Sequence, residues 1–190
     1  MDPVEDIAAL GTSLNIPVHV DACLGGFLIA FADMVGVRLE PFDFRVVGVT
    51  SISADTHKFG YAPKVNIFFL LFTITICTKG SSVIMYSSTK YIHHQYFVSA
   101  DWTGGIFISP TLAGSRSGGV IAATWAALMN YGFNGYIEAT KNLLNCANKV
   151  KEGVLRIPGL KLLGNPKLCI VAFSSDEFHI YRLADEMKVK

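Results

Sequence analysis

Short apolar runs, each followed by a polar or glycine-rich segment, alternate along this chain with stretches in which apolar residues recur at helical spacing. Residues Asp2 to Glu5 predict a helix start, as a capping box with proline at the first helical position, and Gly11 predicts its end. The β-branched runs Ile16–Val20 and Val46–Ala54 predict buried strands, and the small apolar residues of Gly25–Val35 predict a helix between them. This order is typical of the parallel sheet of an α/β fold.

The rest of the chain continues with shorter elements and two helical stretches. A break at Pro158 and Gly159 separates the last helical stretch from the C-terminal elements. The predicted strands are Ser82–Tyr86, Leu160–Leu163 and Leu168–Phe173. The predicted helices are Val120–Tyr131, Gly135–Arg156 and Phe178–Met187, and we expect the first of them to be packed against other elements.

Composition limits the classes of function. Sixteen basic and 15 acidic residues give the chain of 190 residues a net charge of +1, which argues against a nucleic-acid interface. The mean hydropathy of +0.41 is high for a free-standing soluble domain, so we expect apolar surface to be buried against a larger assembly. The four cysteines are widely spaced, which indicates reduced thiols, with neither a disulfide framework nor a zinc site. His93 and His94 are adjacent, so they are not expected to converge on one metal and are assigned to the surface.

A lysine and a carboxylate follow the two predicted parallel strands. Asp21 ends the first strand, and Lys58 lies at the tip of a polar elbow after the second. Both are therefore expected at the carboxyl ends of parallel strands, where α/β sheets place their ligands. A lysine next to a buried strand is expected to have a depressed pKa, which makes its amine nucleophilic and suits Schiff-base chemistry. The alternative is an ordinary lysine on a surface loop.

This pair meets the requirements of pyridoxal 5′-phosphate. The lysine would bind the aldehyde of the cofactor, and the carboxylate would keep the pyridine nitrogen protonated so that the ring accepts electrons. Asp55 is a competing candidate for the second role, but it is close to Lys58 in sequence and is expected to shape the elbow. His19 is interpreted as a core residue with satisfied hydrogen bonds rather than as a ligand.

Four stretches of the sequence also resemble a known family. They are His19–Phe27, Thr50–Lys64, Asp101–Gly105 and Ser109–Gly119. In these stretches the chain resembles the sphingosine-1-phosphate lyases, which are similar to the group II pyridoxal-phosphate-dependent decarboxylases. The resemblance covers nearly the whole chain except residues 65–79. The runs around Asp21 and Lys58 are long enough to distinguish the lyases from the decarboxylases, which a His-Lys pair by itself does not.

The resemblance implies an α/β fold of the aspartate-aminotransferase-like type, fold type I. Residues 1–156 would be part of the large, cofactor-binding domain, and residues 157–190 the start of the small C-terminal α+β domain. The Gly- and Ser-rich stretch near residue 114 would reach the cofactor phosphate of a neighbouring subunit; its alternative is a simple helix-entry turn. The implied site consists of Asp21 and Lys58 as catalytic residues, of Asp21, Ala22, His57, Lys58, Gly114 and Ser115 around the cofactor, and of Lys64 at the substrate phosphate.

The implied activity is cleavage of sphingoid-base 1-phosphates to a fatty aldehyde and phosphoethanolamine, by a homodimer on the cytosolic face of the endoplasmic reticulum membrane. The family's membrane anchor, the first half of its cofactor domain and most of its small domain would lie outside this chain. We therefore expect the chain by itself to be inactive. Two alternatives stay open: an amino-acid decarboxylase, and a non-catalytic, membrane-associated fragment that depends on residues 67–77.

Residues 65–79 interrupt the resemblance. Their apolar run from Ile67 to Cys77 is too short to span a bilayer, which needs about 20 residues, and it is typical of an aggregation-prone strand. The hypothesis is a retained intron translated in frame, because the codons AAG-GTA-AAT for residues 64–66 would form a splice donor and the AAG codon of Lys79 an acceptor. The alternative is a genuine extra hairpin.

Overall fold

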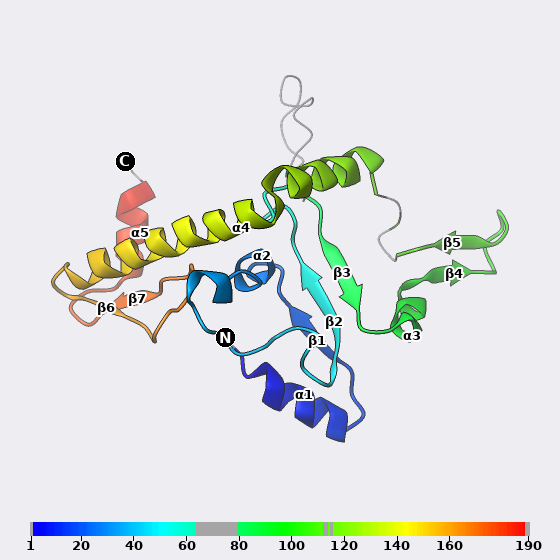
Figure 1. The fold of residues 1–190 in the computed structure, drawn as a ribbon, viewed down its shortest axis with the longest axis horizontal. Coiled ribbons are helices and arrows are strands. Elements are labelled where there is room, and N and C mark those ends of the chain that lie inside the picture. Colours follow the sequence, from blue (N-terminus) through cyan, green and yellow to red (C-terminus); the bar gives the residue numbers. More distant parts are fainter. Residues whose placement is uncertain (1, 64–79, 112–113, 115, 189–190) are drawn as a thin grey trace.

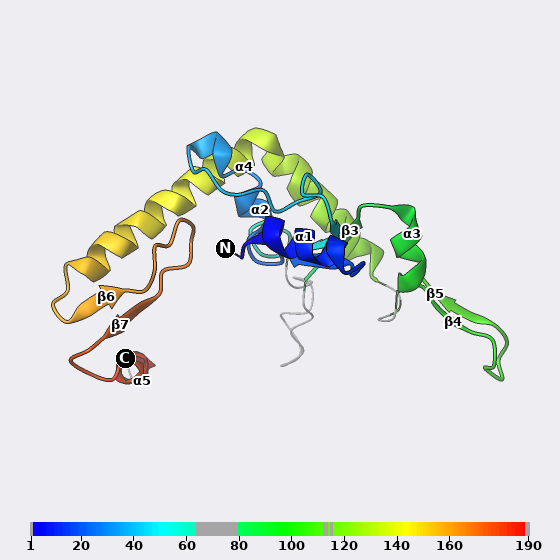
Figure 2. The ribbon, with the colours of Figure 1, turned by 90° about the horizontal axis from the view of Figure 1, so that it is seen from below.

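The computed structural model describes residues 2–63, 80–111, 114 and 116–188. Its centre is a small mixed sheet with a long helix across one side (Figure 1). A β-ribbon lies at one end of the molecule, and the C-terminal elements lie at the other end, as both views show (Figures 1 and 2). The predictions for residues 65–79, the intron hypothesis included, lie outside the described residues.

The central sheet has the strand order β1-β2-β3. Strands β1 (Val18–Asp21) and β2 (Val49–Ala54) are parallel, and β3 (Val83–Tyr86) is antiparallel to β2. The connection from β1 to β2 contains two short helices, α2 (Gly26–Ile29) and η1 (Asp33–Val35). The predicted strand–helix–strand unit with a parallel pair is therefore confirmed, although each strand starts later than predicted.

Helix α1 (Val4–Ser13) packs on β1. The predicted capping box is wrong: Pro3 is the N-cap residue, and no side chain makes a capping hydrogen bond there. The helix also continues past Gly11. That glycine is buried, and a side chain on it would clash with Val18, so it allows the helix to approach the sheet closely rather than ending the helix.

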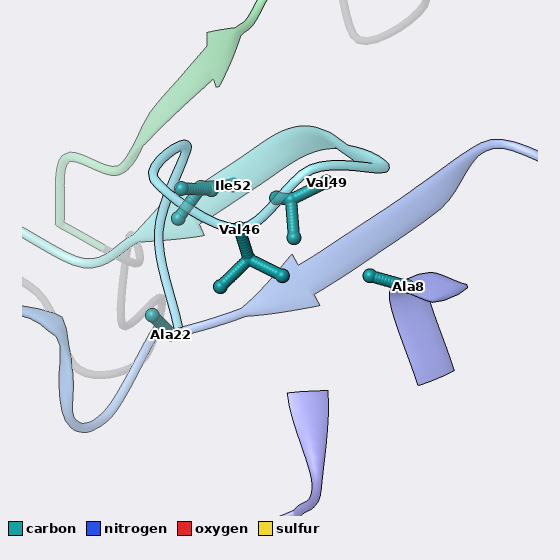
Figure 3. Packing of buried hydrophobic residues seen from close by; sticks show 5 residues of the cluster. All are labelled: Ala8, Ala22, Val46, Val49 and Ile52. Atoms are coloured by element: carbon teal, nitrogen blue, oxygen red, sulfur yellow. The ribbon is translucent and has the colours of Figure 1, made fainter. Parts of the chain in front are cut away.

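The core between α1 and the sheet is built from small and β-branched side chains. Figure 3 shows five of them, and none is more than 7% exposed. The core residues are Ala8, Ala22, Val46, Val49 and Ile52. Such small side chains let the helix, the loop before β2 and the sheet come close together.

The long helix α4 (Gly118–Leu155) combines the two predicted helices, which meet at a kink. The kink is at Gly132, with φ 57° and ψ −177°, a backbone conformation that glycine adopts readily. The part after the kink buries Tyr136 and Leu144. The part before it was expected to be packed but exposes Trp125 and other large apolar side chains, because the described residues place nothing over that face.

The remaining elements are short. Strands β4 (Phe97–Ser99) and β5 (Phe107–Ser109) form an antiparallel ribbon that follows α3 (Thr89–Ile92) and η3 (His93–Gln95). His93 and His94 are exposed, as predicted.

At the C-terminal end, β6 (Leu160–Leu162) pairs with β7 (Phe173–Ser175), and α5 (Tyr181–Lys188) follows. The predicted pair of strands is confirmed, but its second strand begins at Phe173 rather than at Leu168. Residues 168–170 line a cavity beside α2 instead, and pairing starts at Phe173. Among the described residues, no helix combines the length and the apolar character that crossing a membrane requires.

Gly48 provides a test of the close packing between α1 and the loop before β2. Its φ of +103° disfavours any side chain, and a Cβ there would lie 2.5 Å from Thr12 Oγ1 and 2.6 Å from the Ala8 carbonyl oxygen. We expect Gly48→Ala to lower the free energy of unfolding by about 3 kcal/mol, from backbone strain and overpacking together. The measurement is urea unfolding followed by circular dichroism.

The matched control is Gly36→Ala. Gly36 has a similar φ of +83°, but a Cβ there would meet no atom within 4 Å. Gly36→Ala should therefore lower the free energy of unfolding by backbone strain alone, about 1–2 kcal/mol. Equal costs for the two variants would contradict the packing argument.

Candidate active site

The candidate site lies where β1 and β2 end. Because the strands are parallel, their carboxyl ends meet at one edge of the sheet, and Asp21 at the end of β1 is in register with Ser53 of β2. Two backbone hydrogen bonds join the loops that follow: Ala22 N–H donates to the Ser53 carbonyl (2.9 Å), and Asp55 N–H donates to the Cys23 carbonyl (3.2 Å). The elbow that carries Lys58 is thereby fixed to the loop that follows Asp21.

Asp21 carries an exposed carboxylate that is held in the ionised form. Its Oδ1 accepts hydrogen bonds from the Cys23 backbone N–H (3.0 Å) and from Ser53 Oγ (3.3 Å). Hydrogen bonds from the thiol and the backbone of Cys23, aided by Ser53, hold the pKa of Asp21 below its ordinary value. The carboxylate is therefore anionic at neutral pH and open to a positively charged partner.

His19 supports this arrangement from the same face of β1. Its ring nitrogens lie 2.9 Å from Ser51 Oγ and 3.1 Å from Ser53 Oγ. Its hydrogen bonds are satisfied, as predicted, but the expected core position is wrong, since His19 is exposed. The side chains of alternate strand residues share one face, and this face of the described sheet is uncovered.

Lys58 forms an ion pair with Asp55. Its Nζ lies 2.8 Å from Asp55 Oδ2, and the Lys58 side chain is 35% exposed. The hydrogen bond to Asp55 raises the pKa of Lys58, and burial opposes this only in part. The prediction of a depressed pKa is therefore wrong, because the carboxylate three residues earlier stabilises the charged amine more than burial destabilises it.

Asp55 itself is nearly buried, with 7% of its surface exposed. Burial acts to raise its pKa, but hydrogen bonds from Lys58 and from Ser82 Oγ outweigh burial and lower the pKa below its ordinary value. Both oxygens of the carboxylate are thus occupied, Oδ1 by Ser82 and Oδ2 by Lys58.

His57, the residue before Lys58, faces the neighbouring strand. Its Nδ1 lies 2.6 Å from the Ser81 carbonyl oxygen, which requires Nδ1 to carry the proton, and its Nε2 lies 3.7 Å from Asp55 Oδ2. Thr56 Oγ1 donates to the same carbonyl (2.7 Å), and Ser81 Oγ lies 2.6 Å from Thr124 Oγ1 on α4. These contacts join the elbow to β3 and α4.

The far end of the elbow is held by aromatic residues that the sequence analysis did not single out. Tyr136 on α4 donates a hydrogen bond to the Gly60 carbonyl (2.8 Å), and the ring of Tyr61 stacks on Tyr131 at 4.8 Å. Gly60 is required, because a Cβ there would lie 2.5 Å from the Thr56 carbonyl oxygen. Helical periodicity could have identified Tyr136 as buried, but no signal in the sequence links it to Gly60.

The remaining predicted residues are placed only in part. Ala22 is buried beside the strand end. Gly114 has a φ of +77°, and its backbone carbonyl accepts a hydrogen bond from Thr111 Oγ1; no contact with Asp21 or Lys58 is found for it in the described part of the chain. Lys64 and Ser115 lie outside the described residues. In the described ranges, no cluster of three His, Cys, Asp or Glu side chains could hold a metal ion, and Cys23, Cys146 and Cys169 are free thiols.

Comparison with known proteins identifies the family. The sequence model of the pyridoxal-dependent decarboxylase conserved domain matches residues 1–176. The chain belongs to this family. Within it, the chain is 53% identical to sphingosine-1-phosphate lyase 1 of Rattus norvegicus, over 100% of this chain and 31% of the relative. It is 49% identical to the sphingosine-1-phosphate lyase of Drosophila melanogaster, over 98% of this chain and 32% of the relative. It thus spans about a third of the length of these relatives.

Solved structures confirm the predicted fold. The sphingosine-1-phosphate lyase of Burkholderia pseudomallei superposes with a TM-score of 0.83 and 43% identity, over 99% of this chain and 39% of that chain. Glutamate decarboxylase of Lactobacillus brevis superposes with a TM-score of 0.73 at 20% identity, over 99% of this chain and 41% of that chain, which supports the fold alone. The chain therefore has the α/β, fold type I architecture of the pyridoxal-dependent enzymes, and it spans about 40% of the length of these two structures.

The hydrogen bond of Tyr136 to the elbow can be tested by Tyr136→Phe. The variant keeps the ring but leaves the buried Gly60 carbonyl without its donor, which should cost about 1–3 kcal/mol of unfolding free energy. Tyr131→Phe is the control, because Tyr131 stacks in the same cluster with an exposed side chain. A cost for Tyr136→Phe no larger than that of the control in urea unfolding would contradict the assignment.

The pH dependence of stability tests the Asp55–Lys58 pair. Because the pKa of Asp55 is lowered, its contribution is present above about pH 4 and is lost as the pH falls through the pKa in the folded state. Because the pKa of Lys58 is raised, its contribution is complete below about pH 10 and is lost as the pH rises through the folded-state pKa. The stability difference between wild type and Lys58→Met should therefore be largest from pH 5 to 9 and shrink on both sides. A difference that stays constant from pH 2 to 12 in chemical unfolding would argue against the pair.

Proposed function

We propose that this chain is part of a pyridoxal-phosphate-dependent lyase that cleaves sphingoid-base 1-phosphates to a fatty aldehyde and phosphoethanolamine. The main support is the 53% identity to sphingosine-1-phosphate lyase 1 over 100% of this chain, which includes the strand ends that carry Asp21 and Lys58. The family by itself leaves decarboxylation open, whereas this identity favours the lyase.

The residues at the strand ends fit the cofactor. Lys58 offers a primary amine that is 35% exposed, and Asp21 offers an exposed carboxylate that is anionic at neutral pH. Ala22, next to Asp21, carries only a buried methyl group, so it places no bulky side chain beside the carboxylate. When bound, pyridoxal phosphate supplies an electron sink for the pair of electrons released by carbon–carbon bond cleavage.

Each residue then has a defined role. Asp21 would hold the protonated pyridine nitrogen, since its hydrogen bonds keep it charged. Lys58 would bind the cofactor aldehyde and, once the substrate amine has replaced it, would donate a proton to the substrate carbon. Ser53 and His19 would hold the Asp21 carboxylate in place.

Phosphate recognition is assigned to other positions. Gly114 and Ser115 are proposed to reach the cofactor phosphate of a neighbouring subunit, and Lys64 to bind the substrate phosphate, where a point charge is suitable. His57 is proposed to contact the cofactor. We further propose that the complete enzyme is a homodimer on the cytosolic face of the endoplasmic reticulum membrane. The isolated chain should be inactive, because the exposed sheet face around His19 leaves the cofactor open to water.

The test is a chimera in which this chain replaces the matching segment of the rat enzyme. We expect the chimera to release fatty aldehyde and phosphoethanolamine from sphinganine 1-phosphate, and Lys58→Ala to abolish this release, by about 1,000-fold or more. The isolated chain should show no turnover in the same assay. A second chimera without residues 65–79 tests whether that segment interferes.

Two outcomes would contradict the proposal. The first is a chimera that binds pyridoxal phosphate yet releases carbon dioxide from an amino acid and leaves the sphingoid phosphate intact, which would establish the decarboxylase. The second is binding of the isolated chain to liposomes that depends on residues 67–77, together with inactive chimeras, which would establish the non-catalytic alternative.

A further inference from the structure

Asp55 is a second carboxylate at the site, and the proposed reaction gives it no role. Its carboxylate is the nearest charged partner of the lysine that carries the chemistry, with 2.8 Å between Asp55 Oδ2 and Lys58 Nζ. Asp55 is 7% exposed, so the carboxylate side of this contact is shielded from water, unlike the carboxylate of the exposed pair between Lys161 and Asp176.

The position of Asp55 is fixed independently of Lys58. Its backbone N–H donates to the Cys23 carbonyl at 3.2 Å, which ties it to the loop after β1. Ser82 Oγ, next to β3, donates to Oδ1. The carboxylate is therefore a rigid acceptor, and the flexible lysine side chain is the partner that adapts to it.

We infer that Asp55 is a positioning residue for Lys58. It fixes the amine at the strand ends and keeps the amine charged until Lys58 reacts with an aldehyde. The inference rests on the proposed function, in which Lys58 binds the cofactor aldehyde. An ammonium ion is not a nucleophile, so a charged Lys58 is protected from unwanted electrophiles. Its reaction with an aldehyde would require loss of one proton to solvent, and the C=N bond would then form with release of the aldehyde oxygen as one water molecule.

Other titratable groups face the pair but do not replace Asp55. Cys23 and Asp21, from the end of β1, also favour the charged form of Lys58, both more weakly than Asp55. His57 Nε2 lies 3.7 Å from the same oxygen of Asp55 that binds Lys58. Removing Asp55 should therefore have a larger effect on Lys58 than removing any one of these groups.

The experiment measures the acetylation rate of Lys58 in the cofactor-free chain of 190 residues. Succinimidyl acetate reacts with neutral amines, and peptide mass spectrometry resolves each lysine. In Asp55→Asn, we expect Lys58 to react about tenfold faster at pH 8, and the midpoint of its pH profile to move about one unit lower, because loss of a carboxylate within hydrogen-bond distance lowers a lysine pKa by about that much.

Two further variants exclude a purely structural effect. If Asp55→Asn only loosened the elbow, the limiting acetylation rate of Lys58 at high pH would rise and the midpoint of the pH profile would stay unchanged. Asp55→Glu restores the charge and should restore the midpoint of the wild type. Asp176→Asn is the matched control, since Asp176 pairs with Lys161 where both side chains are more than half exposed, and it should leave Lys58 unchanged.

A second arm separates this inference from the proposed function. Pyridoxal phosphate is added to the chimera with the rat enzyme, followed by borohydride, and the adduct on Lys58 is quantified. An equal midpoint in wild type and Asp55→Asn overturns the role of Asp55, whatever the adduct yield. A shifted midpoint without any adduct on Lys58 of the chimera supports the charge-holding contact but overturns the cofactor function on which the inference rests.

Discussion

The parallel pairing of β1 with β2 is the constraint on which the candidate site depends. It sets the end of β1 beside the end of β2, so that Asp21 is in register with Ser53 and backbone hydrogen bonds join the residues at the ends of the two strands. A shift of one residue in this register would turn every side chain of β1 to the opposite face, and would separate His19 and Asp21 from the serines of β2. The strand register therefore determines which side chains meet at this edge of the sheet.

The close approach of helices and loops to the sheet explains why the core is small. Small residues, among them Gly11, Gly26 and Gly48, let helices and loops approach the sheet where larger side chains would clash. The core is correspondingly small, and large apolar side chains such as Val47 and Trp125 stay more than 60% exposed. The high mean hydropathy of the sequence thus corresponds to apolar surface that the described residues do not cover by themselves.

Sequence patterns predict the structure where it depends on residues that are close in sequence, and they fail where it depends on the position of single side chains or on contacts between distant residues. The β-branched runs before Asp21 and before Lys58 predicted both strands, and two strands joined by a helix predicted the parallel pair. The predicted capping box at Asp2 and the predicted pKa of Lys58 are wrong, because each depends on the position of one side chain. The hydrogen bond from Tyr136 to Gly60 spans 76 positions, and no local signal indicates such a contact.

The two carboxylates near Lys58 differ in their surroundings, and this difference favours a separate role for each. Asp55 is nearly buried, and both of its oxygens already have donors, so it has little capacity for another partner. Asp21 is exposed, is kept ionised by hydrogen bonds to one oxygen, and faces the open side of the sheet. A ring nitrogen that arrives with a ligand needs an available anion, which Asp21 provides and Asp55 does not. The environments of the two groups, more than their distance from Lys58 along the chain, favour Asp21 as the partner of the ring and Asp55 as the partner of the amine.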